Sequence, residues 1–183
     1  ARMKMHVRES ALLVVDIQSG LLPVIEHEEQ VRESAAWLLR LAGKLQVPVV
    51  VSEHFPEKIG QTVPELFELL PPAAERVRKT AFSAVRDGVL EGTAVGRAEQ
   101  VVVAGTEAHV CVLQTVLDLL EADKRVFVVA ESVGSRRAED RLLALERMRQ
   151  AGAVVVCREM VAFEWLERGG TDLFRDVLRT LIR

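Results

Sequence analysis

The chain has 183 residues, of which 49% are hydrophobic and 28% are charged, and its formal net charge is -3. This length and composition are typical of one globular domain with a substantial core. The slightly acidic balance, without a basic block, argues against a nucleic-acid partner, and no apolar run approaches the ~18 residues that a membrane span needs.

Apolar strand patterns alternate with amphipathic helix patterns in the first half of the chain. An unbroken apolar run at 11–15 predicts a strand buried on both faces. A helix is predicted at about 28–45 and a second strand at 47–51. The segment that follows predicts a surface loop at 52–64, a short helix at 65–70, either a strand or an extended loop at 77–83, and a modest helix at 85–91.

The second half continues the alternation. It predicts strands at 101–104, 125–130 and 153–156, helices after Cys111 and at about 138–150, a helical turn at 160–166 and a final helix after Thr171. Strands separated by helices favour an α/β fold, a three-layer αβα sandwich with a mostly parallel, Rossmann-like sheet of five to six strands. No linker or repeat interrupts the pattern, so residues 1–183 are predicted to form a single domain.

Polar residues follow several predicted strands, and ligands of such sheets bind outside the carboxyl ends of the strands. Asp16 ends the first apolar run, His54 follows the second, and Cys111 follows the third. An ionised carboxylate after five apolar residues needs a partner. Asp16 is either a turn-stabilising residue or a base close enough to take the proton of Cys111.

Cys111 lies at or near the first turn of the helix that follows the central strand. The helix dipole and unpaired N–H groups there can lower the pKa of a thiol and make it a nucleophile, although cysteine is also often simply buried. Lys79, in a basic run, is either a solvated residue or the charge that stabilises a thiolate. Cys111 and Cys157 have contexts that favour free thiols in a reducing compartment, which predicts a cytoplasmic protein.

Several common sites are missing from the sequence. No G-x-G-x-x-G follows the first strand, and there is no P-loop and no G-x-S-x-G elbow, so nucleotide binding and serine hydrolysis are disfavoured. His27, His54 and His109 have no metal-ligand spacing. No cofactor is therefore expected. The first six residues carry positive charge without an apolar core, so no signal peptide is expected either.

Three segments in this order resemble the isochorismatase-like cysteine hydrolases. They are Val-Val-Asp-Ile-Gln at 14–18, Lys-Thr-Ala-Phe-Ser at 79–83 and Gly-Thr-Glu-Ala-His-Val-Cys-Val at 105–112. The segment at 159–164 is similar to the family's C-terminal signature. The segments at 52–56 and 62–66 resemble the isochorismatase-domain-containing branch, which is nicotinamidase-related. The resemblance covers about residues 10–166.

The resemblance implies a role for each matched position. Asp16 matches the family's base, Lys79 its lysine and Cys111 its nucleophile. A non-proline cis peptide is expected between Thr106 and Glu107. With this cis bond, the resemblance implies that the backbone N–H groups of Glu107 and Cys111 form an oxyanion hole.

The departures from the family narrow the expected chemistry. Nicotinamidases bind a metal through an aspartate and histidines after the second strand, whereas the segment here offers only His54, so no metal site is expected. True isochorismatases lack the nucleophilic cysteine, so Cys111 favours hydrolysis of an amide or related C–N bond. The expected activity is metal-independent hydrolysis of a small amide, imide or carbamoyl-type substrate through a thioester. Phe82, His54 and Glu107 are expected to line the substrate pocket.

Two alternatives stay open from the sequence. The chain could be a catalytically silent small-molecule-binding or scaffold protein on the same fold, or a metal-dependent nicotinamidase. The family commonly assembles, so the resemblance also implies a homo-oligomer, a dimer or a tetramer, with a small molecule rather than nucleic acid or a membrane as the other partner.

Overall fold

The computed structural model describes residues 3–183. Residues 1 and 2 lie outside the described residues; they belong to the N-terminal segment in which no signal peptide is expected. A six-stranded sheet forms its centre, with strand order β3-β2-β1-β4-β5-β6 and every neighbouring pair parallel. The strands are β1 (Ser10–Val15), β2 (Val49–His54), β3 (Glu75–Lys79), β4 (Gln100–Thr106), β5 (Arg125–Gly134) and β6 (Val154–Val156). The predicted three-layer α/β fold is confirmed.

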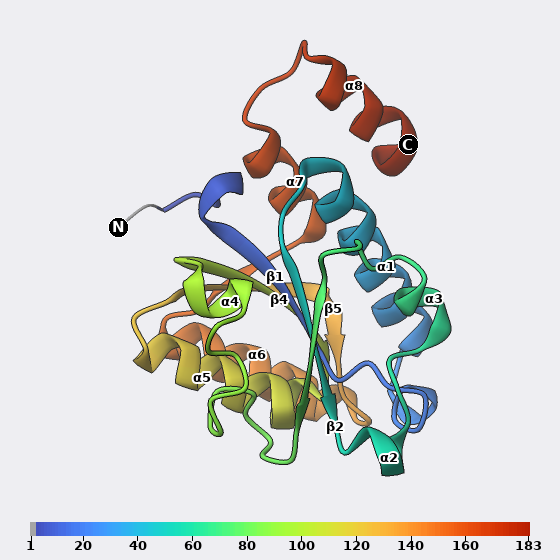
Figure 1. Ribbon diagram of the computed structural model, residues 1–183, viewed down its shortest axis with the longest axis vertical. Coiled ribbons are helices and arrows are strands. Elements are labelled where there is room, and N and C mark those ends of the chain that lie inside the picture. The colour runs from blue at the N-terminus through green and yellow to red at the C-terminus, as the bar shows by residue number, and fades with distance from the viewer. Residues whose placement is uncertain (1–2) are drawn as a thin grey trace.

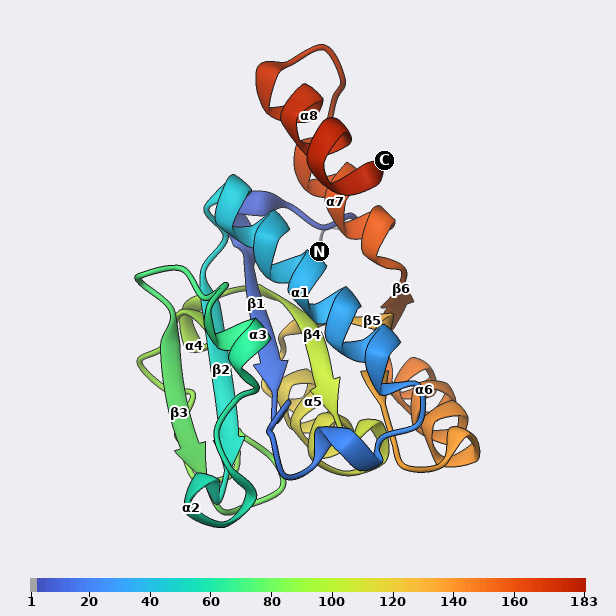
Figure 2. The same ribbon diagram turned by 90° about the vertical axis from the view of Figure 1, so that its right-hand side faces the viewer.

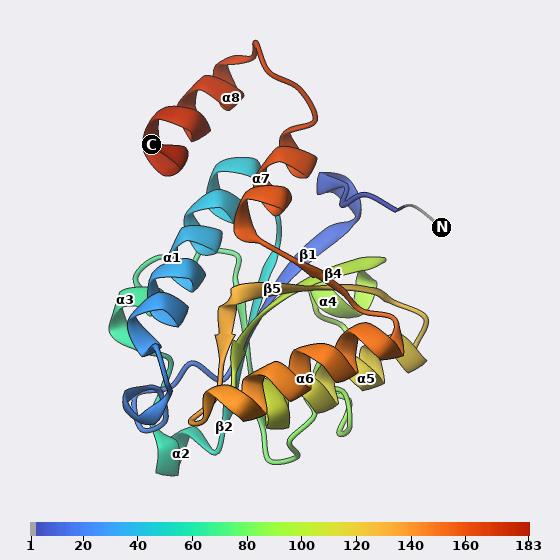
Figure 3. The ribbon, with the colours of Figure 1, turned by 180° about the vertical axis from the view of Figure 1, so that it is seen from behind.

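Helices cover both faces of the sheet (Figures 1 and 2). They are α1 (Glu28–Leu45), α2 (Pro56–Ile59), α3 (Pro64–Phe67), α4 (Ala94–Arg97), α5 (Leu113–Glu121), α6 (Ala138–Ala151), α7 (Arg158–Leu166) and α8 (Asp172–Val177). One face packs against α1, α3 and α7, and the other against α4, α5 and α6. The view from behind shows α5 and α6 side by side on the second face (Figure 3). Among residues 3–183, no helix combines the length and the apolar character needed to cross a bilayer.

The apolar run of β1 explains how both layers attach to the sheet. Leu12 and Val14 belong to the core on the α1 side, whereas Leu13 and Val15 belong to the core on the α5 side. Side chains alternate between the faces of a strand, so a central strand covered on both faces has to be apolar throughout. All of these residues are at most 1% exposed.

Local turn chemistry overrides the helix patterns between the second and third strands and after β3. The helix predicted at 85–91 is wrong, because these residues form turns in which Gly88 adopts a φ of 73°, and Gly92, directly after them, has a φ of 80°. Such positive φ values are incompatible with a right-handed helix. The loop predicted at 52–64 contains the end of β2 and the short α2, and α3 ends earlier than predicted. The ambiguous segment around 77–83 is strand β3 up to Lys79.

All six strands run in one direction, so their carboxyl ends meet at one end of the sheet. In Figure 2, β1, β2, β3 and β4 all point towards the end of the molecule at which α2 lies, opposite α8. In this strand order β2 and β3 lie on one side of β1, and the chain then returns to form β4 on the other side of β1. The crevice at such a switch point is where ligands of open α/β sheets bind. The fold therefore predicts that a ligand binds near the residues at the carboxyl ends of β1, β2, β3 and β4.

Candidate active site

Parallel pairing brings the polar residues of four strand ends together. Val15 pairs with Ser52 on one side and with Gly105 on the other, and His54 pairs with Lys79. The next residue after β1, Asp16, consequently lies between the ends of β2 and β4. The strand order places residues from four distant parts of the chain in one cluster.

Gly105 allows β4 to approach β1 closely at this point. A Cβ atom at this position would lie 2.2 Å from the carbonyl oxygen of Val15, and the φ of Gly105 is 143°. Only glycine tolerates both conditions. The next side chain, Thr106, donates from Oγ1 to the Asp16 carbonyl at 2.6 Å, and the peptide bond between Thr106 and Glu107 is cis. The turn that leads to Cys111 is thereby fixed against the end of β1.

Asp16 and Lys79 form a fully buried ion pair. The Oδ2 atom of Asp16 lies 2.8 Å from Nζ of Lys79, and each side chain is 1% exposed. Ser52 donates from Oγ to Oδ1 of Asp16 at 2.7 Å. Besides this contact with Lys79, Oδ2 accepts no hydrogen bond within residues 3–183, so it keeps a lone pair available for a further proton. A buried carboxylate needs such a cation, because an unpaired charge in the interior is strongly destabilising.

His54 completes the surroundings of the Lys79 ammonium. Its Nδ1 atom lies 3.2 Å from Nζ, and Lys79 also donates to the carbonyl oxygen of Ala81 at 3.1 Å. Burial and the positive charge of Lys79 lower the pKa of His54, so its ring is neutral at pH 7. Since an ammonium group can only donate, Nδ1 accepts and the ring proton lies on Nε2. The ring stacks on Phe82, which is half exposed, with centroids 5.6 Å apart.

Cys111 lies in a π-helical turn, Ala108–Val112, that leads into α5. It is 7% exposed, and its sulfur, an oxygen of Asp16 and a ring nitrogen of His54 all lie within 4.8 Å of one another. Burial first, and then the negative charge of Asp16, raise the pKa of Cys111 to about 12, although Lys79 opposes the effect. The expectation of a lowered thiol pKa at the helix start is therefore wrong, because burial and the neighbouring carboxylate outweigh the effect of the Lys79 ammonium.

The carboxylate of Glu107 points to a residue that the sequence did not single out. Arg136, in the loop between β5 and α6, donates from its backbone N at 3.0 Å and from Nε at 3.0 Å to Oε2 of Glu107. The Glu107 carbonyl accepts from the backbone N–H groups of Val110 and Val112 at 3.0 and 3.1 Å. Glu107, which the sequence predicts to line the substrate pocket, thus has both its carboxylate and its carbonyl oxygen already bonded to the protein.

Ser52 and Gln18 also support the cluster without having been predicted as site residues. Gln18 is fully buried and pairs with the backbone of His54, donating from Nε2 to its carbonyl at 2.9 Å and accepting from its N–H at 2.8 Å. The signal that could have identified Gln18 is its position two residues after Asp16, because polar residues directly after an apolar strand require partners. Nothing local in the sequence links Ser52 to Asp16.

The cluster also has the composition of a metal site. Asp16, His54 and Cys111 could each offer one ligand atom to an ion. The Lys79 ammonium, however, already lies between Asp16 and His54, and a metal ion would be a second cation in the same buried space. The donor set therefore fits a buried lysine better than it fits a metal ion.

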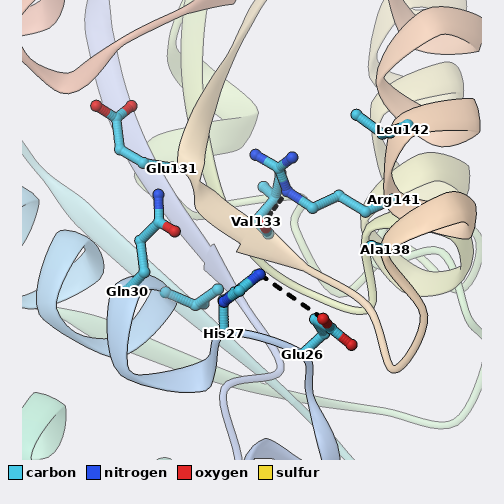
Figure 4. A pocket seen from close by; sticks show the side chains of 9 residues that line it. Glu26, His27, Gln30, Glu131, Val133, Ala138, Arg141 and Leu142 are labelled. Carbon is cyan, nitrogen blue, oxygen red and sulfur yellow. Dashed lines mark hydrogen bonds and ion pairs between the residues drawn. The ribbon is translucent and has the colours of Figure 1, made fainter.

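A separate pocket of about 200 Å³ lies at the end of β5, between α1 and α6 (Figure 4). Arg141 reaches over it, donating from Nε to the carbonyl of Val133 at 2.9 Å and from Nη2 to that of Ala130. Strand β6 pairs with β5 only at residues 127–129, so Arg141 supplies donors for carbonyl groups beyond that ladder. Asp16, Lys79 and Cys111 do not line this pocket, and the hydrogen bonds of Arg141 give that residue a structural role at the end of β5.

Known proteins resemble this chain over most of its length. Residues 10–160 match the isochorismatase domain family. Isochorismatase domain-containing protein 2 of Homo sapiens is 40% identical over 173 residues, covering 94% of this chain and 82% of the human protein. MAR1 ribonuclease from Caenorhabditis elegans superposes with a TM-score of 0.90 at 32% identity, covering 98% of this chain and 93% of that one. The YcaC gene product of Escherichia coli, described as an octameric hydrolase of unknown specificity, shares the fold with a TM-score of 0.89 at 24% identity, covering 100% and 92%.

Proposed function

Because this chain belongs to the isochorismatase family, we propose that it is a cysteine hydrolase that cleaves a small amide, imide or carbamoyl-type C–N bond without a metal ion. The observation that carries the proposal is the buried ion pair of Asp16 and Lys79 beside the sulfur of Cys111. A buried carboxylate next to a thiol is the arrangement that general-base activation of a nucleophile requires.

The raised pKa of Cys111 defines the resting state of the proposed mechanism. The thiol is protonated, Asp16 is negative and Lys79 is positive, so the site has no net charge. Transfer of the thiol proton to Oδ2 of Asp16 leaves a neutral acid, a thiolate and the same ammonium. The net charge stays zero, so the transfer needs no additional buried charge, and Lys79 stabilises the thiolate as it forms.

The reaction then proceeds in two halves. In the first, Sγ of Cys111 bonds to the substrate carbonyl carbon, and the π electron pair moves to the oxygen. The backbone N–H groups of Glu107 and Cys111 stabilise that oxyanion. The C–N bond breaks as the nitrogen takes the proton from Asp16. The amine departs, and the acyl group stays on Cys111 as a thioester.

In the second half, Asp16 removes a proton from a water molecule as the water oxygen bonds to the thioester carbon. The C–S bond breaks, and the sulfur takes the proton back from Asp16. One amide and one water give one acid and one amine, and the enzyme returns to its resting state.

A screen for amine or ammonia release from small amides, imides and carbamoyl compounds tests this proposal. The wild type and Cys157→Ser should release amine, and Cys111→Ala should not. The Cys157→Ser variant is the matched control, because its cysteine is also a free thiol but lies outside the cluster. Turnover that persists in Cys111→Ala contradicts the proposed mechanism.

One observation favours the alternative of a silent binding protein, namely that Cys111 is nearly buried and has a raised pKa. The same screen separates the two. A silent protein would be stabilised by a compound, or protected by it from alkylation at Cys111, without any release of amine.

The biological setting follows from the same proposal. A small-molecule substrate fits a cluster in which the nucleophile is only 7% exposed. A cytoplasmic, reducing setting is supported by the free thiols of Cys111 and Cys157. A homo-oligomer is supported by the octameric structural relative, and light scattering on the purified protein would show whether the predicted dimer or tetramer forms.

A further inference from the structure

The loop between β5 and α6 is hydrogen-bonded to the turn that precedes the nucleophile Cys111. The side chain of Glu107 is only 10% exposed, and its carboxylate accepts hydrogen bonds from both the backbone N–H and the Nε–H of Arg136. A charged pair in which one partner is nearly buried is held more firmly than a surface ion pair. Arg136, whose own side chain is 59% exposed, thus fixes the residue that follows β4 from outside the cluster.

The same loop makes a second contact with this turn. Nδ1 of His109 lies 2.8 Å from Oγ of Ser135, the residue before Arg136. The loop is itself anchored, because the carbonyl of Ser135 accepts from the backbone N–H of Glu26 at 2.9 Å. Two side chains of the segment that ends at Cys111 are therefore tied to one loop, which is tied in turn to the segment before α1.

We infer that Arg136 is a positioning residue, which holds Glu107 so that its backbone N–H faces the oxygen of a substrate carbonyl attacked by Cys111. The inference rests on the proposed function, since it assigns Arg136 a part in stabilising the oxyanion of that reaction. Arg136 acts only through Glu107. Its contact leaves the Asp16–Lys79 pair and the thiol untouched, so it should affect the oxyanion and not the nucleophile.

Two reactions of Cys111 separate these effects. In acylation by p-nitrophenyl acetate, sulfur adds to the carbonyl carbon, an oxyanion forms, and the C–O bond breaks to release p-nitrophenolate and leave a thioester. In alkylation by iodoacetamide, sulfur bonds to the methylene carbon as iodide leaves, and no oxyanion forms. Only acylation needs the N–H donors.

The experiment compares Arg136→Ala with Arg137→Ala, both in a Cys157→Ser background. Arg137 is the matched control, because its ion pair with Glu139 is exposed on both sides and does not touch the turn. Arg136→Ala should acylate about 10- to 100-fold more slowly, because a small misplacement of a catalytic group has effects of this size. Its alkylation rate should stay within about two-fold of wild type, and Arg137→Ala should match the wild type in both reactions.

A third variant tests the route through Glu107. Glu107→Gln keeps the backbone N–H but weakens the contact, so it should slow acylation as Arg136→Ala does, and the double variant should be no slower than the worse single one. Acylation by Arg136→Ala at the wild-type rate overturns the inference, and so does an equal loss of acylation and alkylation, which would mark a general structural role. If the wild type acylates no faster than Cys111→Ala, the proposed function itself fails and this inference falls with it.

Discussion

Replacing Asp16 with asparagine should make the Cys111 thiol easier to ionise and at the same time strongly slow catalysis. The negative charge of Asp16 raises the pKa of Cys111, whereas the ammonium of Lys79 lowers it. Asparagine keeps an oxygen that can accept the Ser52 hydroxyl, so the substitution removes charge with little change of shape. The thiol is then left beside an unopposed cation and without a base.

The size of the effect follows from the distances in the cluster. The Asp16 oxygen and the Cys111 sulfur are no more than 4.8 Å apart. Two unit charges at that separation interact by about 3.5 kcal/mol at an effective dielectric constant of about 20. One pKa unit corresponds to about 1.36 kcal/mol, so the pKa of Cys111, about 12 in the wild type, should fall by about 2.5 in Asp16→Asn.

Two assays in a Cys157→Ser background measure the two consequences. The ultraviolet absorbance of the thiolate, taken against Cys111→Ala, should titrate at lower pH in Asp16→Asn than in the parent. Alkylation by iodoacetamide at about pH 8 should be at least about tenfold faster. Amine release should fall by about 10²–10⁴-fold, the usual contribution of a general base.

The reasoning is refuted if Asp16→Asn titrates at the same or a higher pH than the parent. It is also refuted if the variant keeps its turnover, because a thiolate held by Lys79 alone would then be sufficient. Circular dichroism of each variant shows whether it is folded.

Three further predictions follow from the same contacts. Lys79→Met should lower the free energy of unfolding by about 3–5 kcal/mol in urea titrations, because it leaves Asp16 charged and unpaired in the interior, and Asp16→Asn in the same chain should restore most of it; an additive double variant contradicts this. Burial raises the pKa of Glu53, but hydrogen bonds from Thr62 and Arg76 outweigh it and lower the pKa overall. The stability that Glu53 contributes is therefore present above its usual pKa of about 4.3 and is lost as the pH falls through its lowered pKa in the folded protein. Glu53→Gln should lower the free energy of unfolding by about 1–3 kcal/mol at pH 7 and by less in acid. A difference from wild type that does not depend on pH contradicts this prediction. Dialysis against a chelator should leave amine release unchanged, and nicotinamide should release no ammonia; activity that is lost on dialysis and restored by zinc would instead support the metal-dependent alternative.

The sequence predicts the fold and the membership of the cluster because both depend on patterns along the strands. An unbroken apolar run at 11–15 is typical of a strand covered on both faces, and Asp16, His54 and Lys79 directly follow or end strands. The motif resemblance then selects Asp16, Lys79 and Cys111 from the other polar residues at the strand ends. The pairing register brings them together.

Other features depend on contacts that have no local signal. The side chains of Ser52 and Arg136 reach Asp16 and Glu107 across 36 and 29 residues of sequence. The raised pKa of Cys111 depends on how completely the fold buries the thiol, which position at a helix start does not indicate. The helix predicted at 85–91 is absent because Gly88 adopts a positive φ, and the helix-like pattern of the sequence does not indicate that conformation.

The most direct test of the account is the capture of the acyl-enzyme. A substrate that releases amine is mixed with the enzyme, the reaction is quenched in acid during the first turnover, and the intact mass and the peptide masses are measured. The account predicts that the acyl portion of the substrate is attached to Cys111 and that the Cys111→Ala protein carries none and releases no amine. Amine release by a protein in which Cys111 is never acylated, or by Cys111→Ala itself, would contradict it.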